Sequence, residues 1–370
     1  MKVFLFLAFV SPFVGAWFSG NQATGKRVAV LISSYGLLKP DLSYDLEELA
    51  QAYLVLHDHG IALDIISPAG GAVPVKTNKD TLSYIQRFKN HTPALRQLGA
   101  TIAAKNADPG KYDGIFIVGG GGAMMDLPSD PGTQKLLTEL VKAGRPIAAV
   151  CHGPAALTDI KTPDGGFFVA GKQICSFTNV EEKAFSSEML DRFPFFIEDR
   201  MRQRNAIYVS NAPMLPYVAV DGNLITAQNP GSVARAGEAL VSKLGLTLRP
   251  RTLFKDEAAM ALLARARVSG SYQIDLALNS QAAAYDHQYL ALYAFYSYRL
   301  AQTVADKRTE LGIMAAVSRH VAHPMLLDAL VRAQHEQGFG KKAANSLDRL
   351  ERDFPEHAAL AELKKLVGAD

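Results

Sequence analysis

Residues 147–157 read IAAVCHGPAAL, and this stretch decides the fold. Its first four residues are small and apolar and follow Pro146, which is typical of a short buried strand. Cys151 stands at the end of this strand, and Gly153 and Pro154 then begin a run of helix-forming residues. The pattern predicts a strand, a sharp turn and a helix, with Cys151 on the turn.

The place of Cys151 on this turn favours a reactive thiol. A nucleophile on such a turn projects above the sheet, and the first free N–H groups of the following helix stabilise a negative sulfur. A thiol with a pKa of about 8.5 is ionised to a few per cent at neutral pH, whereas one near 6 is roughly nine-tenths ionised. We therefore expect a nucleophile with a lowered pKa. The alternative is a small buried hydrophobic residue, as free cysteines often are.

Composition describes an ordinary globular chain. With 370 residues, 48% hydrophobic and 20% charged, the chain is long enough for two domains. Its formal charge is only +3 and it has no dense block of Lys and Arg, so nucleic acid is not an expected partner. Two cysteines cannot make a disulfide framework. Cys175 lies in a predicted strand at 172–177, where we expect a core residue.

The beginning of the chain resembles a secretory signal peptide at residues 1–16. One lysine precedes a short apolar run, and Val14 and Ala16 form a small-residue cleavage site. The run of about 15 residues is shorter than the roughly 20 that span a bilayer. We therefore expect export to the periplasm or medium, with no membrane span after signal removal. A retained N-terminal anchor and a buried N-terminal strand or helix are the alternatives.

Strands and helices alternate over the first two thirds of the chain. Aliphatic runs predict strands at 26–33, 61–66 and 112–118, and apolar residues at helical spacing predict helices at 41–59 and 132–143. This alternation indicates a doubly wound parallel sheet, which binds ligands at the carboxyl ends of its strands.

A run of four glycines, residues 119–122, follows the strand at 112–118. Glycine lets the backbone approach a ligand closely, so the N–H groups near Gly120 and Gly121 are candidates for an oxyanion site facing Cys151. The run lacks the spacing of a Walker or dinucleotide loop. A flexible surface loop is the alternative.

Six stretches together resemble the ThiJ/PfpI superfamily, which is glutamine amidotransferase-like, and within it the heat-shock chaperone and glutathione-independent glyoxalase branch. They are residues 45–50, 67–71, 118–128, 147–157, 177–182 and 221–230. The resemblance covers about residues 26 to 245. It implies a flavodoxin-like doubly wound α/β domain with a nucleophile elbow, which we expect at 26–246.

The resemblance also implies a set of site residues. The catalytic cysteine of the family corresponds to Cys151, its adjacent histidine to His152, and the acidic residue that orients the histidine to Glu182. The glutamate hydrogen-bonded to the thiol corresponds to Glu48. Neighbours on a helix differ by about 100° around its axis, so we expect Glu47 to be solvated.

We expect no metal and no other cofactor. His57 and His59 are two residues apart on a predicted helix and point to different sides, so they make a poor metal site, and we expect both at the surface. Three positions depart from the branch, which usually has histidine at Gly121, an aromatic residue near Met125 and histidine-proline at 51–52. The preferred substrate is therefore left open.

The implied activity is that of a lyase, a glyoxalase or D-lactate dehydratase that converts a 2-oxoaldehyde such as methylglyoxal to a 2-hydroxy acid without glutathione. Repair of glycated amines is a related activity of the family. The alternative is a stress-response protein without turnover, either a holdase chaperone or a redox sensor in which Cys151 forms a sulfinic acid stabilised by Glu48. A thiol amidase or peptidase is a weaker alternative.

The last third of the chain is predicted to be helical. Residues 247–255 read as a linker, and 256–370 as an all-α domain of five or six helices. Helices at 325–337 and 341–353 resemble one tetratricopeptide-like hairpin, and 283–305 contains a second candidate. Such hairpins bind proteins, so a protein partner and a homodimer are both possible. We expect the aromatic residues of 285–298 in the core, with a partner surface as the alternative.

Overall fold

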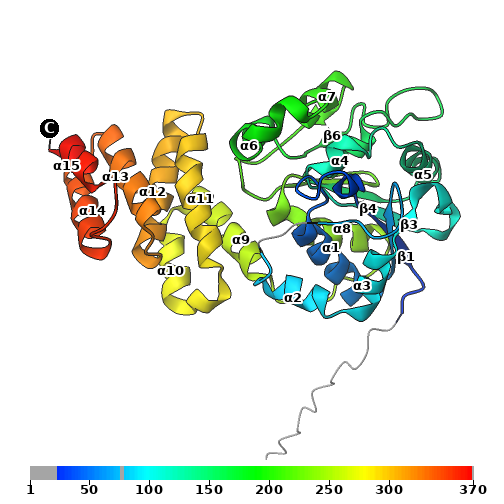
Figure 1. The fold of residues 1–370 in the computed structure, drawn as a ribbon, viewed down its shortest axis with the longest axis horizontal. Helices are drawn as coiled ribbons and strands as arrows, with labels where there is room; N and C mark the ends of the chain where they lie inside the picture. Colours follow the sequence, from blue (N-terminus) through cyan, green and yellow to red (C-terminus); the bar gives the residue numbers. More distant parts are fainter. Residues whose placement is uncertain (1–22, 76–78, 369–370) are drawn as a thin grey trace, which may run out of the picture.

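The computed structural model describes residues 23–75 and 79–368. The expected signal peptide, residues 1–16, lies outside the described residues. Figure 1 shows two parts, a sheet flanked by helices and a row of helices that extends to one side and ends at the C-terminus. Within the described residues, no helix combines the length and the apolar character needed to cross a membrane.

Seven strands form one sheet in the order β3-β2-β1-β4-β5-β9-β8, and only the pair of β8 and β9 is antiparallel. The order reverses at β1, so ligands are expected where β1, β4 and β5 end. The predicted doubly wound α/β fold is confirmed. The strands are β1 (Arg27–Leu31), β2 (Ala62–Ser67), β3 (Ile102–Ala103), β4 (Gly114–Ile117), β5 (Ile147–Val150), β8 (Val218–Asp221) and β9 (Leu224–Ala227).

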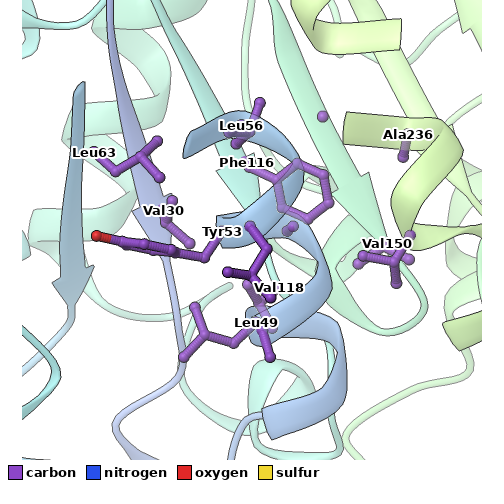
Figure 2. Packing of buried hydrophobic residues seen from close by; sticks show 14 of the residues in the cluster. Val30, Leu49, Tyr53, Leu56, Leu63, Phe116, Val118, Val150 and Ala236 are labelled. Carbon is purple, nitrogen blue, oxygen red and sulfur yellow. The ribbon is translucent and has the colours of Figure 1, made fainter. Parts of the chain in front are cut away.

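Helices cover both faces of this sheet, because alternate residues of each central strand point to opposite sides. Val28 and Val30 of β1 pack in the core with α1 and α8, whereas Ala29 and Leu31 pack in the core with α5. Figure 2 shows the first core, in which Val30 and Phe116 lie among residues of α1. The helices of this part are α1 (Leu46–Asp58), α2 (Ser83–Lys89), α3 (Thr92–Gly99), α4 (Gly122–Met125), α5 (Pro131–Lys142), α6 (Asn179–Phe185), α7 (Ile197–Gln203) and α8 (Val233–Lys243).

Local signals explain the ends of α1. The Asp45 side chain accepts hydrogen bonds from the backbone N–H groups of Glu47 and Glu48, so the helix begins at Leu46. Gly60, with φ of 77°, ends the turn that follows the helix.

The prediction of an α-helix directly after the turn at Cys151 is wrong. A 3-10 helix of five residues, Gly153–Leu157, follows the cysteine instead of a longer α-helix. The Thr158 hydroxyl donates to the Ala155 carbonyl oxygen (2.9 Å), and such bonding competes with helix continuation. A short 3-10 turn contributes little of the dipole that was expected to lower the thiol pKa.

Cys175 comes directly after β6 (Gln173–Ile174), which pairs with β7 (Ile207–Tyr208) in a small two-stranded sheet. The Cys175 side chain is fully buried and its Sγ lies 3.1 Å from the Thr226 carbonyl oxygen. The prediction of a core cysteine is confirmed.

The C-terminal third is all-helical, and seven α-helices occur in its described part, more than the five or six expected. The predicted hairpin corresponds to α13 and α14, which pack together. The second candidate is longer than 283–305, because α12 continues to His320. The likeness to tetratricopeptide repeats stays a prediction. The helices are α9 (Lys255–Ser269), α10 (Tyr272–Gln281), α11 (His287–Leu300), α12 (Val304–His320), α13 (Pro324–Glu336), α14 (Gly340–Asp353) and α15 (Leu360–Val367).

The segment between α8 and α9 is tied to its neighbours by partly buried polar contacts. The Arg251 guanidinium donates to Glu238 (2.8 Å) and to Glu257 (2.7 Å). The backbone N–H of Arg249 donates to Nε2 of His59 (3.0 Å), whose Nδ1–H donates to the Val55 carbonyl oxygen (2.7 Å). His59 is therefore buried, and its expected surface position is wrong.

Candidate active site

Cys151 occupies a strained backbone position at the end of β5. Its φ is 57°, in the left-handed region that residues other than glycine rarely adopt. The backbone is held on both sides, because the Cys151 N–H donates to the Ala227 carbonyl oxygen (2.8 Å) and the Cys151 carbonyl oxygen accepts from the N–H of Phe177 (2.9 Å). This is the geometry of a nucleophile elbow.

Two glycines allow other chain segments to approach the elbow. A Cβ on Gly119 would lie 2.7 Å from Oε2 of Glu48 and 2.8 Å from Cβ of Cys151. A Cβ on Gly153 would lie 2.6 Å from the Ile117 carbonyl oxygen. Side chains do not approach so closely, so both positions require glycine. The role of Gly119 in the site could not be predicted, because the run of four glycines is the only local signal at this position.

Glu48 comes from α1 and reaches the thiol across the end of β4. Its Oε2 accepts a hydrogen bond from the Gly119 N–H (2.7 Å), and its carboxyl group also interacts with the Cys151 thiol. The side chain is fully buried, and Oε1 makes no hydrogen bond to a nitrogen or oxygen of the described residues. Because Oε2 is already an acceptor, a proton on this carboxyl group belongs on Oε1.

His152 links the thiol to a second carboxylate. Its Nδ1 lies 3.3 Å from Sγ of Cys151, and its Nε2 lies 2.9 Å from Oε2 of Glu182 on α6. If Nε2 carries the proton and donates it to Glu182, Nδ1 is free to accept the thiol proton. The ring is flanked by Phe177 and Phe193, with ring centres at 4.9 and 5.9 Å, and neither contact could be predicted from local sequence.

The protonation states differ among the three acidic groups. Burial raises the pKa of the Cys151 thiol, and the charges of Glu48 and Asp45 act in the same direction. Burial also raises the pKa of Glu48 well above 4.5. Burial alone would raise the pKa of Glu182 as well, but the hydrogen bond with His152 lowers it overall. The site thus favours the protonated form at Glu48 and the carboxylate at Glu182.

The expectation of a free thiolate with a lowered pKa is contradicted by this environment. Cys151 is 5% exposed, and a short 3-10 turn replaces the longer helix whose dipole was expected beside the sulfur. Protonation of Glu48 removes this negative charge and supplies an O–H that can donate to a sulfur anion. The thiol therefore depends on its neighbours, His152 and Glu48, to give up its proton.

Gly120 and Gly121 pack on the segment before α1. A Cβ on Gly120 would lie 2.5 Å from the backbone nitrogen of Asp45, and one on Gly121 would collide with Leu42. In the described part of the chain, neither backbone N–H makes a hydrogen bond, so both remain available as donors. A cavity of about 290 Å³ reaches both glycines, and Cys151 is not part of its lining.

Comparison with known proteins gives the family. The model of the DJ-1/PfpI family matches residues 26–243. The chain belongs to the DJ-1/PfpI family. It is 30% identical over 239 residues to the glutathione-independent glyoxalase hsp3101 of Schizosaccharomyces pombe, a match that covers 61% of this chain and 98% of that protein.

Two further comparisons agree. The chain is 29% identical to the glutathione-independent glyoxalase HSP31 of Saccharomyces cerevisiae, over 56% of this chain and 93% of that protein. Among solved structures, the rapid encystment protein of Francisella tularensis matches with a TM-score of 0.55 and 28% identity, over 59% of this chain and 99% of that one. These matches leave a large part of this chain, about the length of its helical region, without a counterpart.

The structure shows the surroundings of the positions that depart from the pattern expected for the glyoxalase branch. A histidine at Gly121 would require Leu42 to move, because Leu42 already fills that space. Met125 is the second position that departs from the expected pattern. Its neighbour Met124 is buried in the core that contains α5. Gln51, at a position where the branch has histidine, donates through Nε2 to Asp256 of α9 (3.0 Å).

The prediction that Glu47 is solvated is wrong. Glu47 is 6% exposed, pairs with Lys79 (2.9 Å) and accepts a hydrogen bond from the Tyr289 hydroxyl of α11 (2.8 Å). The 100° rotation separates the two glutamates as expected, but the helical region covers the side of α1 on which Glu47 lies.

The described residues contain no group of three or more His, Cys, Asp or Glu side chains arranged to hold a metal ion.

Proposed function

We propose that the chain is a glutathione-independent glyoxalase that converts a small 2-oxoaldehyde such as methylglyoxal to the 2-hydroxy acid, a lyase reaction with Cys151 as nucleophile. The observation that carries the proposal is the contact of a strained cysteine with a buried glutamate and a carboxylate-bound histidine. The names of the relatives support the substrate class.

The first step forms a bond between Cys151 and the aldehyde carbon. His152 takes the thiol proton on Nδ1 while Glu182 stabilises the imidazolium through Nε2, and the sulfur adds to the carbonyl. The N–H groups of Gly120 and Gly121 hold the oxyanion until His152 returns the proton. The product is a hemithioacetal and His152 is neutral again.

The second step moves a proton between neighbouring carbons through an enediol. His152 takes the proton from the thiol-bearing carbon, and neutral Glu48 protonates the ketone oxygen. His152 then protonates the second carbon, and Glu48 recovers its proton from the first hydroxyl group. The resulting thioester is hydrolysed by water, which releases the 2-hydroxy acid and the thiol.

The burial of the sulfur favours small substrates. Cys151 is only 5% exposed, which suits a three-carbon aldehyde better than a peptide or a glycated protein. The limited access to Cys151 therefore favours the glyoxalase reaction over amidase, peptidase and deglycase activity.

The test is lactate production from methylglyoxal by the purified chain. Cys151→Ala should lower kcat/KM by at least about 10³-fold, because the covalent route is lost. Cys175→Ala is the matched control, since the Cys175 sulfur contacts Tyr217 and Thr226 and none of the four proposed catalytic side chains, and it should keep the activity. No turnover by the wild type, or equal turnover by Cys151→Ala, would exclude the proposal. Suppression of client aggregation that persists in Cys151→Ala would then favour the holdase alternative.

We also propose export through a signal peptide at residues 1–16. N-terminal sequencing of the protein recovered from its native compartment should begin at Trp17. Recovery of an intact N-terminus in a membrane fraction would favour the retained anchor instead.

A further inference from the structure

One face of α11 contacts both helices that carry the proposed acidic residues. Tyr289 and Tyr296 are seven residues apart on α11, so their side chains leave the helix within about 20° of each other around its axis. The Tyr289 hydroxyl donates to Glu47 (2.8 Å), the residue of α1 that precedes Glu48. The Tyr296 ring packs edge-on against Phe185, the last residue of α6, with ring centres 5.0 Å apart.

α6 is short, and its position decides where Glu182 lies. A helix of seven residues is not stable by itself and depends on the contacts made at its two ends. Near its N-terminal end, the Glu181 carboxylate accepts a hydrogen bond from the Met214 N–H (2.8 Å). At its C-terminal end, Phe185 is 40% exposed and packs against the Tyr296 ring. The helical region therefore holds one end of α6.

Phe185 is connected to His152 by two routes. The first is α6 itself, because Glu182 lies one turn before Phe185 and its Oε2 is 2.9 Å from Nε2 of His152. The second runs through Phe177, whose ring centre lies 6.5 Å from that of Phe185 and 4.9 Å from that of His152. A shift of Phe185 would therefore disturb both the hydrogen bond and the ring contact of the histidine.

The two parts of the chain do not pack continuously around this pair of rings. A cavity of about 250 Å³ lies between them. Its lining includes Phe177, Phe185, Tyr289 and Leu292. Loss of the Tyr296 ring would therefore leave the end of α6 with room to move.

We propose that Tyr296 is a positioning residue for the reaction at Cys151, which holds α6 through Phe185 and so keeps Glu182 on Nε2 of His152. The proposal rests on the proposed function and assigns a task in it to the helical region. Tyr296 contacts none of the reacting groups itself. A displacement of about 1 Å in an active site can lower a rate about 10²-fold, so a distant contact of this kind affects turnover.

Lactate assays with the full chain test the effect on turnover. Tyr296→Ala should lower kcat with methylglyoxal about tenfold and change KM by less than about twofold, because the groups that bind the substrate are kept. Tyr296→Phe keeps the ring and should keep most of kcat. Tyr272→Ala, which removes an exposed tyrosine of α10, is the control.

A second variant removes the same pair of rings from the side of α6. Phe185→Leu should lower kcat to a similar extent as Tyr296→Ala. Because Phe185 is 40% exposed, this variant should fold even where Tyr296→Ala unfolds the helical region. Circular dichroism checks the fold of both.

A double-mutant cycle shows whether Tyr296 acts through Glu182. In the Glu182→Gln background the charge that stabilises the imidazolium is already lost, so Tyr296→Ala should cause little further loss of kcat.

Nitrogen NMR of the His152 ring gives a readout that does not depend on turnover. The contact with Glu182 predicts a proton on Nε2 of the neutral ring in the wild type and in Tyr296→Phe. Tyr296→Ala and Phe185→Leu should show a mixture of the two tautomers. His152→Gln identifies the signal among those of the nine histidines.

Three results would overturn the proposal. They are an unchanged His152 tautomer in both Tyr296→Ala and Phe185→Leu, equal losses of kcat in Tyr296→Ala and Tyr296→Phe, or losses that multiply fully in the double variant. If the wild type does not convert methylglyoxal, the proposed function fails, and the tautomer in Tyr296→Ala and Phe185→Leu then decides the positioning role by itself.

Discussion

At the scale of single residues, Glu47 and Glu48 show how position on a helix decides chemistry. Glu48 faces the end of β4 and the Cys151 sulfur, where burial raises its pKa. Glu47 faces the helical region, where Lys79 and Tyr289 hold it as an ion-paired side chain. Two adjacent residues of one type therefore perform unrelated tasks.

Replacing Glu48 by glutamine tests its part in proton transfer. Glu48→Gln keeps the shape and the acceptor for the Gly119 N–H but loses the exchangeable carboxyl proton, so kcat with methylglyoxal should fall by about 10²-fold or more. Steady-state lactate assays measure this loss. The exposed Glu139→Gln serves as control, and an unchanged kcat in Glu48→Gln would remove Glu48 from the mechanism.

The raised pKa of Glu48 also predicts a pH dependence of stability. The folded state keeps its proton at pH values where the unfolded state, with an ordinary pKa of 4.5, has lost it. The folded state then binds more protons, so its stability relative to the unfolded state falls as pH rises above about 4.5. Urea unfolding from pH 5 to 8 should show a steeper decline in the wild type than in Glu48→Gln, and parallel curves would contradict the assignment.

At the scale of elements, α1 lies between the site and the helical region. One side presents Glu48 to the elbow, while Glu47 and Gln51, one turn apart, bind Tyr289 of α11 and Asp256 of α9. A second contact runs from Tyr296 of α11 to Phe185 at the end of α6, with ring centres 5.0 Å apart. The helical region therefore touches both helices that carry the proposed acidic residues.

Removing the Tyr289 hydroxyl tests how much its hydrogen bond to Glu47 contributes to the stability of the protein. Tyr289→Phe deletes the donor to Glu47 and leaves a buried carboxylate with one fewer partner, which should lower the free energy of unfolding by about 1.5–3 kcal/mol. Urea denaturation followed by circular dichroism measures the change. The exposed Tyr272→Phe is the control, and equal stability of both variants would show that the contact contributes little.

At the scale of the whole molecule, the two parts are joined by buried polar contacts as well as by the chain. Arg251 bridges Glu238 of α8 and Glu257 of α9, and Asp256 accepts hydrogen bonds from Gln51 and from the Tyr84 hydroxyl. Contacts that are buried and specific couple the unfolding of the parts they join.

Calorimetry can detect this coupling. The wild type should unfold in one transition, whereas Arg251→Ala, which leaves Glu257 buried without its guanidinium, should separate or broaden it. Arg265→Ala, which changes an exposed arginine of α9, should leave the trace unchanged. Two well-resolved transitions in the wild type would show that the parts unfold independently.

Much of the fold and part of the site could be predicted from local sequence. The aliphatic runs of β1, β4 and β5, the Asp45 cap and Gly60 act over a few residues, so their signals survive without tertiary context. The turn at Cys151 was predictable for the same reason. The role of Gly119 was not, because it depends on Glu48 arriving from a helix 71 residues away.

The sequence by itself determined the doubly wound α/β part, the elbow with Cys151 and the helical character of the last third, since periodicity and turn residues act locally. Only the tertiary structure decided the burial of Glu47 and His59, the protonation of Glu48 and the raised pKa of the Cys151 thiol. Burial and charge depend on every segment packed around a group, and those segments come from distant parts of the chain.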